Sequence, residues 1–210
     1  MGELEQMPQD WEARYREGDV EDMPWFYPEL DPDVAAALSE LQINGGRVLD
    51  LGTGPGTQAI ALAEMGFEVT GSDLASSAIA KAQARGKAAG SSVRFQQDDI
   101  LDSGLTGPFD LIFDRGCLHC LPPESWPVYV NTIQRILTPN GHLLVKCFSH
   151  LETREEGPPN RFSPDNIRSI FEPEMCVQSI RPAKYQGTMD EEPKAMFCII
   201  RQGTTPGEKP

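Results

Sequence analysis

Short apolar runs and amphipathic segments alternate along most of the chain. The runs are about strand length and rich in Val, Leu, Ile and Phe, as strands buried on both faces of a sheet should be. The segments between them repeat apolar residues at helical spacing and are joined by short turns. This alternation predicts a parallel sheet with helices on both faces. The expected strands lie near 46–51, 67–72, 92–96, 109–114 and 142–148, and the expected helices near 32–42, 56–65, 76–88 and 124–137.

The C-terminal part follows a different pattern. Residues 150–162 are charged and rich in Pro and Gly, which predicts a loop that can act as a lid. A short helix capped by Ser163 is expected at 163–171. Two strand-like segments near 175–182 and 194–201 have no helix between them, so they should form a hairpin with one strand antiparallel to the sheet. The expected fold class is α/β, Rossmann-like and mostly parallel.

The N-terminal segment is polar overall but holds too many aromatic side chains for a disordered tail. We expect residues 1–31 to fold over part of the main domain at 32–202, with a loose tail at 203–210. The aromatic residues of this segment are Trp11, Tyr15, Trp25, Phe26 and Tyr27.

Composition narrows the class of protein. The chain has 210 residues, enough for one domain, and a formal net charge of −14. A nucleic-acid partner requires a concentration of Lys and Arg that this sequence lacks, so none is expected. Neither a signal peptide nor a spanning helix is recognisable, which favours a cytoplasmic enzyme without a membrane partner. No pattern specifies an assembly, and a monomer or weak homodimer is expected.

The five cysteines are odd in number and scattered, which favours reduced thiols over a disulfide framework. Cys117 and Cys120 flank His119, but no second Cys/His cluster follows at zinc spacing. No metal site is therefore expected.

A glycine-rich turn follows the first expected strand. Asp50 closes that strand, and Gly52, Gly54 and Gly56 follow at alternating positions. Such a turn lets a ligand approach the backbone where a Cβ would collide. A nucleotide-like ligand is the simplest reason, because a plain strand-to-helix turn rarely needs three glycines. A dinucleotide stays open, because Ala59 preserves the required spacing when counted from Gly54.

Further acids stand after the next two expected strands. Asp73 can accept hydrogen bonds from both hydroxyls of a ribose, although it could instead cap the following helix. An acid at Asp98 or Asp99 can accept from an adenine amino group while Ile100 packs on the ring, the alternative being a solvated turn. Because the carboxyl ends of parallel strands meet at one edge of a sheet, all these acids should face one crevice.

The glycine turn, these acids and the closing hairpin resemble the class I S-adenosylmethionine-dependent methyltransferases over about residues 32–201. The resemblance implies a seven-stranded sheet with one antiparallel strand, and S-adenosyl-L-methionine as cofactor. The glycines would border the methionine and adenosine, the acid after the second strand would bind the ribose, and the acid after the third would contact adenine. The cofactor contacts expected in this part of the chain are Asp50, Gly52, Thr53, Gly54, Gly56, Asp73, Leu74, Asp99 and Ile100.

The motif after the fourth strand points to one branch of that superfamily. Asp114-Arg115-Gly116 is followed shortly by prolines, and a Trp-x-x-Arg-aromatic stretch begins at Trp11. Both features are similar to the thiopurine S-methyltransferases and their tellurite-resistance relatives, in which such a stretch covers the cofactor. This makes Trp11, Asp114 and Arg115 further expected cofactor contacts. Thiopurine enzymes typically lack the three-glycine turn in this form, so the chain is expected to be a relative whose acceptor is not carried over.

His119 and Arg115 are the candidate catalytic residues. His119 could act as a base, which an oxygen or nitrogen acceptor needs more than a thiolate does, or it could be structural. Arg115 could pair with Asp114, pair with the cofactor carboxylate, or lower the pKa of an acceptor thiol.

The leading hypothesis is therefore a methyltransferase acting on a small-molecule acceptor, with sulfur or another soft nucleophile favoured. The alternatives are a methyltransferase for protein lysine or a chain terminus, a non-catalytic adenosyl-binding module, and, as the weakest, a NAD oxidoreductase.

Overall fold

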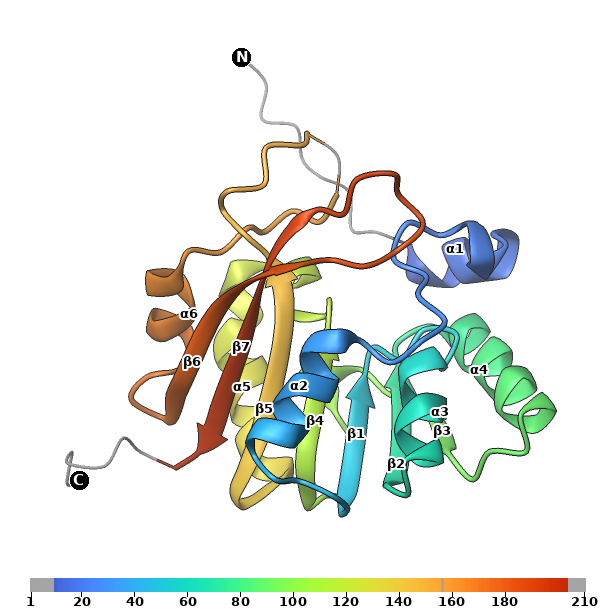
Figure 1. Cartoon of the computed structure of the whole chain (residues 1–210), viewed down its shortest axis with the longest axis horizontal. Coiled ribbons are helices and arrows are strands. Elements are labelled where there is room, and N and C mark those ends of the chain that lie inside the picture. Colours follow the sequence, from blue (N-terminus) through green and yellow to red (C-terminus); the bar gives the residue numbers. More distant parts are fainter. Residues whose placement is uncertain (1–9, 156, 204–210) are drawn as a thin grey trace.

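A computed structural model of the chain describes residues 10–155 and 157–203. Within them a seven-stranded sheet has the strand order β3-β2-β1-β4-β5-β7-β6 (Figure 1). Strand β7 runs antiparallel to both of its neighbours, and the other strand pairs are parallel. The strands are β1 (Arg47–Leu51), β2 (Glu68–Asp73), β3 (Arg94–Gln97), β4 (Phe109–Arg115), β5 (Leu137–Phe148), β6 (Met175–Lys184) and β7 (Lys194–Gln202). The expected α/β fold with one antiparallel strand is confirmed.

Helices cover both faces of this sheet and bury a separate apolar cluster on each. On one face, residues of α5 and α6 pack with those of the central strands, as Ile133 does with Leu49 and Ile112. On the other, α2 and α3 pack against the same strands through residues such as Val34 and Leu62. The helices are α1 (Trp11–Glu17), α2 (Pro32–Glu40), α3 (Thr57–Glu64), α4 (Ser76–Ala88), α5 (Trp126–Ile136) and α6 (Pro164–Phe171).

The helix starts follow from local capping. Asp31 caps α2 by accepting the N–H of Asp33, and Pro32 lies in its first turn. Ser163 and Asn166 form a reciprocal capping box at α6, which confirms the cap expected from the sequence. None of the helices in the described part of the chain is long and apolar enough to cross a membrane.

Strand β5 differs from the sequence expectation. It begins at Leu137 rather than near residue 142, and its pairing with β4 shifts register between Phe109 and Leu111. Asn140 has a φ of 64°, so the residues between the expected helix and the expected strand form an irregular part of the strand instead.

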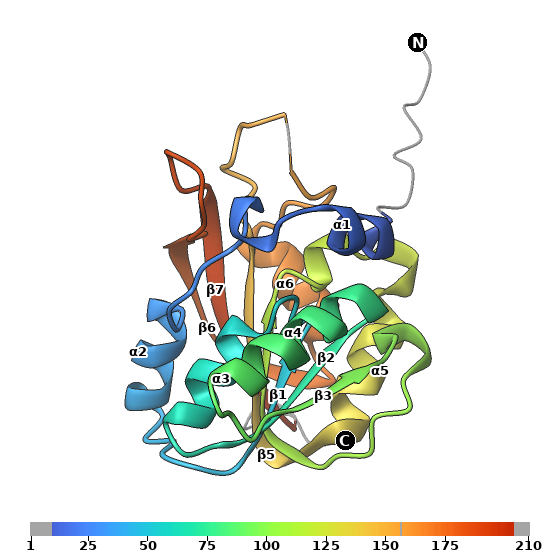
Figure 2. The same ribbon diagram turned by 90° about the vertical axis from the view of Figure 1, so that its right-hand side faces the viewer.

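The N-terminal segment lies across the carboxyl edge of the sheet (Figure 2). Helix α1 packs beside α4, and a 3-10 turn at Val20–Asp22 leads to an extended stretch that reaches α2. A small apolar cluster joins Tyr15, Val20 and Met23 to Ala75 and Ala78, at the start of α4. The expected tail at 203–210 lies outside the described residues from 204 onward.

Candidate active site

The turn after β1 is held from two sides by carboxylates. The Oδ2 atom of Asp50 accepts from the Thr53 hydroxyl at 2.6 Å and from the Ala59 N–H at 3.1 Å. The Gly54 N–H donates to Asp73 Oδ2 at 2.9 Å, and the Thr53 N–H donates to the Ser72 carbonyl at 2.8 Å. Burial raises the pKa of Asp50 to about 6. The turn is therefore fixed to both β1 and β2.

All three glycines of this turn have positive φ: 68° at Gly52, 53° at Gly54 and 82° at Gly56. A Cβ on Gly52 would lie 2.7 Å from the sulfur of Cys117, and one on Gly54 would lie 2.7 Å from the Tyr15 hydroxyl. These close approaches exclude any side chain. The glycines thus let the turn after β4 and the N-terminal segment lie directly against the backbone.

Asp73 ends β2 at this same edge. Besides the Gly54 N–H, its carboxylate accepts the N–H of Ala75 at 2.9 Å through Oδ1. A carboxylate has about four acceptor positions, so capacity for two hydroxyl donors remains. Leu74, next in the chain, leaves 51% of its surface exposed, an apolar face beside that acid.

The acids after β3 differ in their surroundings. Asp99 is exposed and caps a 3-10 turn through the Leu101 N–H, whereas Ile100 is buried. Asp98 accepts the Gly104 N–H through Oδ2, and its buried Oδ1 has no partner among the described residues. Each of the two acids therefore keeps acceptor capacity near the apolar Ile100.

A cavity lies between the glycine turn and the N-terminal segment. Over it, the Trp25 indole N–H donates to the Tyr15 hydroxyl at 3.1 Å. Trp11 packs edge-on against Trp25, with ring centroids 5.6 Å apart, and does not itself line the cavity. The lining residues are Tyr15, Trp25, Phe26, Tyr27, Asp50, Gly52, Thr53, Gly54, Pro55, Thr57, Gln58 and Arg115.

These residues fit an adenosyl cofactor. Asp73 has acceptor positions left for a ribose diol, and the exposed Leu74 presents apolar surface for a base. Each expected cofactor residue thus lies at the carboxyl edge of β1, β2, β3 or β4 or, for Trp11, in the segment above it. Their individual contacts stay predictions.

The turn after β4 is organised by Asp114. Its buried carboxylate accepts the N–H groups of Gly116, Cys117 and Leu118 at 2.9, 2.7 and 3.0 Å, and the Tyr129 hydroxyl at 2.7 Å. Burial raises the pKa of Asp114 to about 6, although these four hydrogen bonds favour the charged carboxylate and act to lower it. The role of Asp114 visible in the structure is therefore to shape the turn that carries His119.

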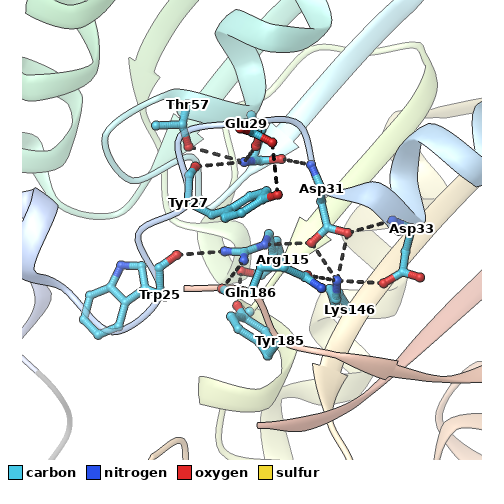
Figure 3. A network of polar contacts seen from close by, with 12 residues as sticks. Trp25, Tyr27, Glu29, Asp31, Asp33, Thr57, Arg115, Lys146, Tyr185 and Gln186 are labelled. Carbon is cyan, nitrogen blue, oxygen red and sulfur yellow. Dashed lines mark hydrogen bonds and ion pairs between the residues drawn. The ribbon is translucent and has the colours of Figure 1, made fainter. Parts of the chain in front are cut away.

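Arg115 pairs with Asp31 and not with Asp114, which corrects one alternative drawn from the sequence. Its Nε lies 3.0 Å from Asp31 Oδ2, and its other two nitrogens donate to the carbonyls of Trp25 and Gln186 at 2.9 and 2.5 Å (Figure 3). Every nitrogen of the guanidinium is thus engaged by the protein. Arg115 therefore ties the N-terminal segment to β4, and its contact with the cofactor stays a prediction.

Lys146 completes the network and was missed by the sequence reasoning. It is fully buried in β5, with Nζ 2.8 and 2.7 Å from the two oxygens of Asp31 and 2.7 Å from Asp33 (Figure 3). Its Nζ also donates to Gln186 Oε1 at 2.5 Å. Two cations and two carboxylates balance, as buried charges must. A lone lysine in an otherwise apolar strand was the available signal.

Gln58 joins residues 23–31, here called the strap, to the helix that follows the glycine turn. Its Oε1 accepts the Asp31 N–H at 2.8 Å, and its Nε2 donates to the carbonyls of Tyr27 and Glu29 at 3.3 and 2.7 Å. Residues 23–31 are therefore fastened to α3, β4 and β5 together. The sequence showed no signal for this, because the partners lie in separate elements.

His119 is buried in the 3-10 turn Leu118–Cys120, among aromatic side chains. Its ring centroid lies 5.2 Å from that of Phe148 and 5.7 Å from that of Tyr185. Its carbonyl accepts from the Asn160 backbone N–H at 3.2 Å and side-chain amide at 3.1 Å, so the loop after β5 supports this turn. Burial, and secondarily the charge of Arg115, lowers the pKa of His119 to about 3.

Comparisons with known proteins show which proteins this chain resembles. A methyltransferase-domain family model matches residues 48–141. A thiopurine S-methyltransferase from Legionella pneumophila (strain Paris) is 27% identical over 190 residues, covering 83% of this chain and 85% of that protein. A 2-heptyl-1-hydroxyquinolin-4(1H)-one methyltransferase from Mycobacteroides abscessus is 28% identical over 170 residues, covering 80% of this chain and 74% of its own length.

A solved structure described as "Conversion of a Disulfide Bond into a Thioacetal Group during Echinomycin Biosynthesis" matches with a TM-score of 0.78. It is 25% identical and covers 93% of this chain and 91% of its own. The residues matched by the family model include the glycine turn, the acids after β2 and β3, and the turn after β4. The chain is therefore an S-adenosylmethionine-dependent methyltransferase with the class I fold, and it resembles thiopurine S-methyltransferases over most of its length.

Proposed function

We propose that this methyltransferase transfers the methyl group of S-adenosylmethionine to the sulfur of a small-molecule acceptor. The cofactor supplies an electrophilic methyl carbon on a sulfonium, which becomes a neutral thioether once the methyl has left. The protein's part in such a displacement is to align the acceptor and exclude water.

The observation that carries this proposal is the character of the turn after β4. It touches the glycine turn through Cys117, and its other neighbours, Phe148, Tyr185 and Trp25, form an aromatic wall. Sulfur is polarizable and packs well against aromatic rings, and thiols reach their reactive anion near neutral pH. Such a wall therefore suits a soft acceptor.

The similarity to thiopurine S-methyltransferases and to the thioacetal-forming protein supports sulfur chemistry. We infer that the acceptor is small because residues 10–31 cover the edge of the sheet where the acceptor must enter. All five cysteines carry free thiols, and we expect the enzyme to act in a reducing compartment such as the cytoplasm.

The test is an acceptor screen with methyl-labelled S-adenosylmethionine. The panel holds aryl thiols, alkyl thiols, a cyclic disulfide, an N-hydroxy heteroaromatic compound and a lysine-containing peptide. We expect the label to appear as a methyl thioether with the thiols. Labelling of the peptide alone would contradict the proposal, and labelling of the N-hydroxy compound alone would move the acceptor atom from sulfur to oxygen.

A matched variant confirms that turnover uses the described site. Asp73→Asn should lower labelling of every accepted thiol at limiting cofactor, because the ribose acid is altered. Asp102→Asn, an exposed acid in a nearby turn, should leave labelling unchanged.

A further inference from the structure

The two ring nitrogens of His119 have different environments. Nδ1 accepts the backbone N–H of Phe148 at 3.3 Å. An atom that accepts this bond must present a lone pair, so Nδ1 carries no proton. The neutral ring therefore holds its single proton on Nε2, and Nε2 is a hydrogen-bond donor.

This donor has no protein partner. Among the described residues no group bonds to Nε2, although only 5% of His119 is exposed. A nearly buried N–H group without an acceptor indicates a place for a ligand.

Nε2 lies next to Gly116, which has a φ of 113°. A Cβ on Gly116 would lie 3.0 Å from Nε2 and 2.6 Å from the Tyr185 hydroxyl. Nε2 and this hydroxyl therefore border the space left by the missing side chain. Cys117, the next residue, touches the glycine turn at Gly52. The donor thus stands close to the contact between the turn after β4 and the glycine turn, where the cofactor is expected.

The ionisable groups near the ring keep it neutral. Arg115 on β4 opposes a positive charge on His119, and burial opposes it further. Tyr185 follows β6 and donates its hydroxyl proton to the Arg115 carbonyl at 2.7 Å, while burial raises its pKa. Cys120, on the same turn, has its pKa raised to about 12 by burial. Phe148 and Asn160, from β5 and the loop after it, carry no titratable group.

We propose that His119 donates its Nε2–H to the methyl acceptor and takes no proton during the transfer. This inference rests on the proposed sulfur acceptor. The acceptor's proton leaves to solvent before transfer, and the resulting thiolate receives the hydrogen bond. The thiolate electron pair then forms the new sulfur–carbon bond, as the electron pair of the breaking carbon–sulfonium bond stays on the cofactor sulfur. One negative and one positive charge disappear together, and no proton is left over.

This role determines which acceptors react. With no base beside it, an acceptor must already be ionised at the working pH, so acidic thiols should be methylated and alcohols of similar shape should not. For each acceptor, kcat/KM should fall as the pH drops below the pKa of that acceptor's own thiol. A protein base would instead impose one limb shared by all acceptors.

Two substitutions separate a donor from a base. His119→Phe keeps the ring shape and removes the donor, and we expect kcat/KM for thiols to fall about 10–100-fold, the range for a hydrogen bond to a charged group. His119→Gln offers an amide N–H near the position of Nε2 and cannot act as a base, so it should recover most of that loss. A loss of about 10²–10⁴-fold in His119→Phe that His119→Gln does not recover would instead identify a base and overturn the proposal.

Nitrogen NMR of the labelled ring supplies a readout independent of turnover. We expect the Nε2–H tautomer with no titration between about pH 5 and 8, the span in which an ordinary histidine changes charge. Unfolding temperature and binding of S-adenosylhomocysteine serve as fold controls for both variants. If the wild type methylates no thiol, the proposed function fails and the inference with it. A titrating His119 in an enzyme that does methylate thiols would overturn the inference alone.

Discussion

The carboxylate of Glu12 caps a helix to which it does not belong. It accepts the backbone N–H of Ser77 at 3.1 Å and the hydroxyl of Ser76 at 3.2 Å, and it also bonds to the Ser77 hydroxyl. Ala75, the N-cap residue of α4, has no side chain that could make these bonds. Helix α1 thereby anchors to the helix that begins directly after Asp73, which connects the N-terminal cover to the predicted ribose site.

Removal of this contact should loosen the cover. We expect Glu12→Ala to raise the Kd for S-adenosylhomocysteine severalfold and to speed tryptic cleavage within α1, because α4 loses its cap and α1 its attachment. Calorimetry and limited proteolysis measure both effects. Glu17→Ala is the matched control, since within the described part of the chain Glu17 pairs only with exposed Arg16 on the same helix. Equal behaviour of the two variants would show that the cap does not hold the cover.

The ribose assignment predicts a loss of cofactor affinity in Asp73→Asn. One acceptor oxygen becomes an N–H2 group that opposes the N–H of Gly54 or Ala75, and a charged acceptor for the ribose is lost. A Kd increase of about 10–100-fold follows from a loss of about 1.5–3 kcal/mol. Calorimetric titration with S-adenosylhomocysteine measures it, with Asp102→Asn as control. A Kd within twofold of the wild type would reject the assignment.

Asp114→Asn should destabilise the fold, although it changes only one atom. Four donors converge on this carboxylate, and an amide would turn a donor toward at least one of them. We expect a loss of about 1–3 kcal/mol in the free energy of unfolding. Urea denaturation measures it, and Tyr129→Phe, which removes a single donor, should cost less. Unchanged stability in both variants would mean that the turn after β4 forms without these bonds.

Arg115→Lys tests whether Arg115 acts through the strap of residues 23–31. A lysine cannot reproduce three directed contacts to Asp31, Trp25 and Gln186. The cofactor-free protein should therefore lose about 1–3 kcal/mol of stability in urea. Arg94→Lys, at an exposed pair with Glu68, is the control. If stability is unchanged while cofactor affinity falls, Arg115 is instead a direct cofactor ligand.

The pH dependence of stability should carry the signature of His119. Its pKa is 6.5 when unfolded and about 3 in the fold, so between these values the unfolded chain binds the extra proton. The contribution of neutral His119 to the free energy of unfolding is complete above pH 6.5 and is lost as the pH falls toward 3. The stability of the wild type relative to His119→Gln should therefore decline below pH 6.5. A constant difference across this range would contradict the low pKa.

Asp50 and Asp114 act in the opposite direction. Burial raises both pKa values to about 6 from 3.8, so the folded protein binds more protons between these values. Their contribution to the free energy of unfolding therefore falls as the pH rises from about 4 to 6. Comparison with His119→Gln at each pH cancels this background, because both carboxyls are present in the two proteins.

Local pattern was enough to predict much of this protein. The alternation of strands and helices, the hairpin that makes β7 antiparallel and the Ser163 cap are all set by short stretches of sequence, and the structure has them. The glycine turn was also readable, because positive φ values at alternating positions favour glycine at Gly52, Gly54 and Gly56. The start of β5 was not, since the irregular part of the strand near Asn140 depends on its pairing with β4.

By itself, therefore, the sequence determined the fold class and the methyl donor, because the alternation of strands and helices and the glycine turn follow from residues close together in the chain. Only the tertiary structure decided which charges pair and which nitrogen of His119 is free. Asp31 and Lys146 stand far apart in the chain but meet in one buried network, and the Phe148 N–H selects the tautomer of His119. Such contacts depend on how distant elements pack, and burial then decides which ionic forms persist.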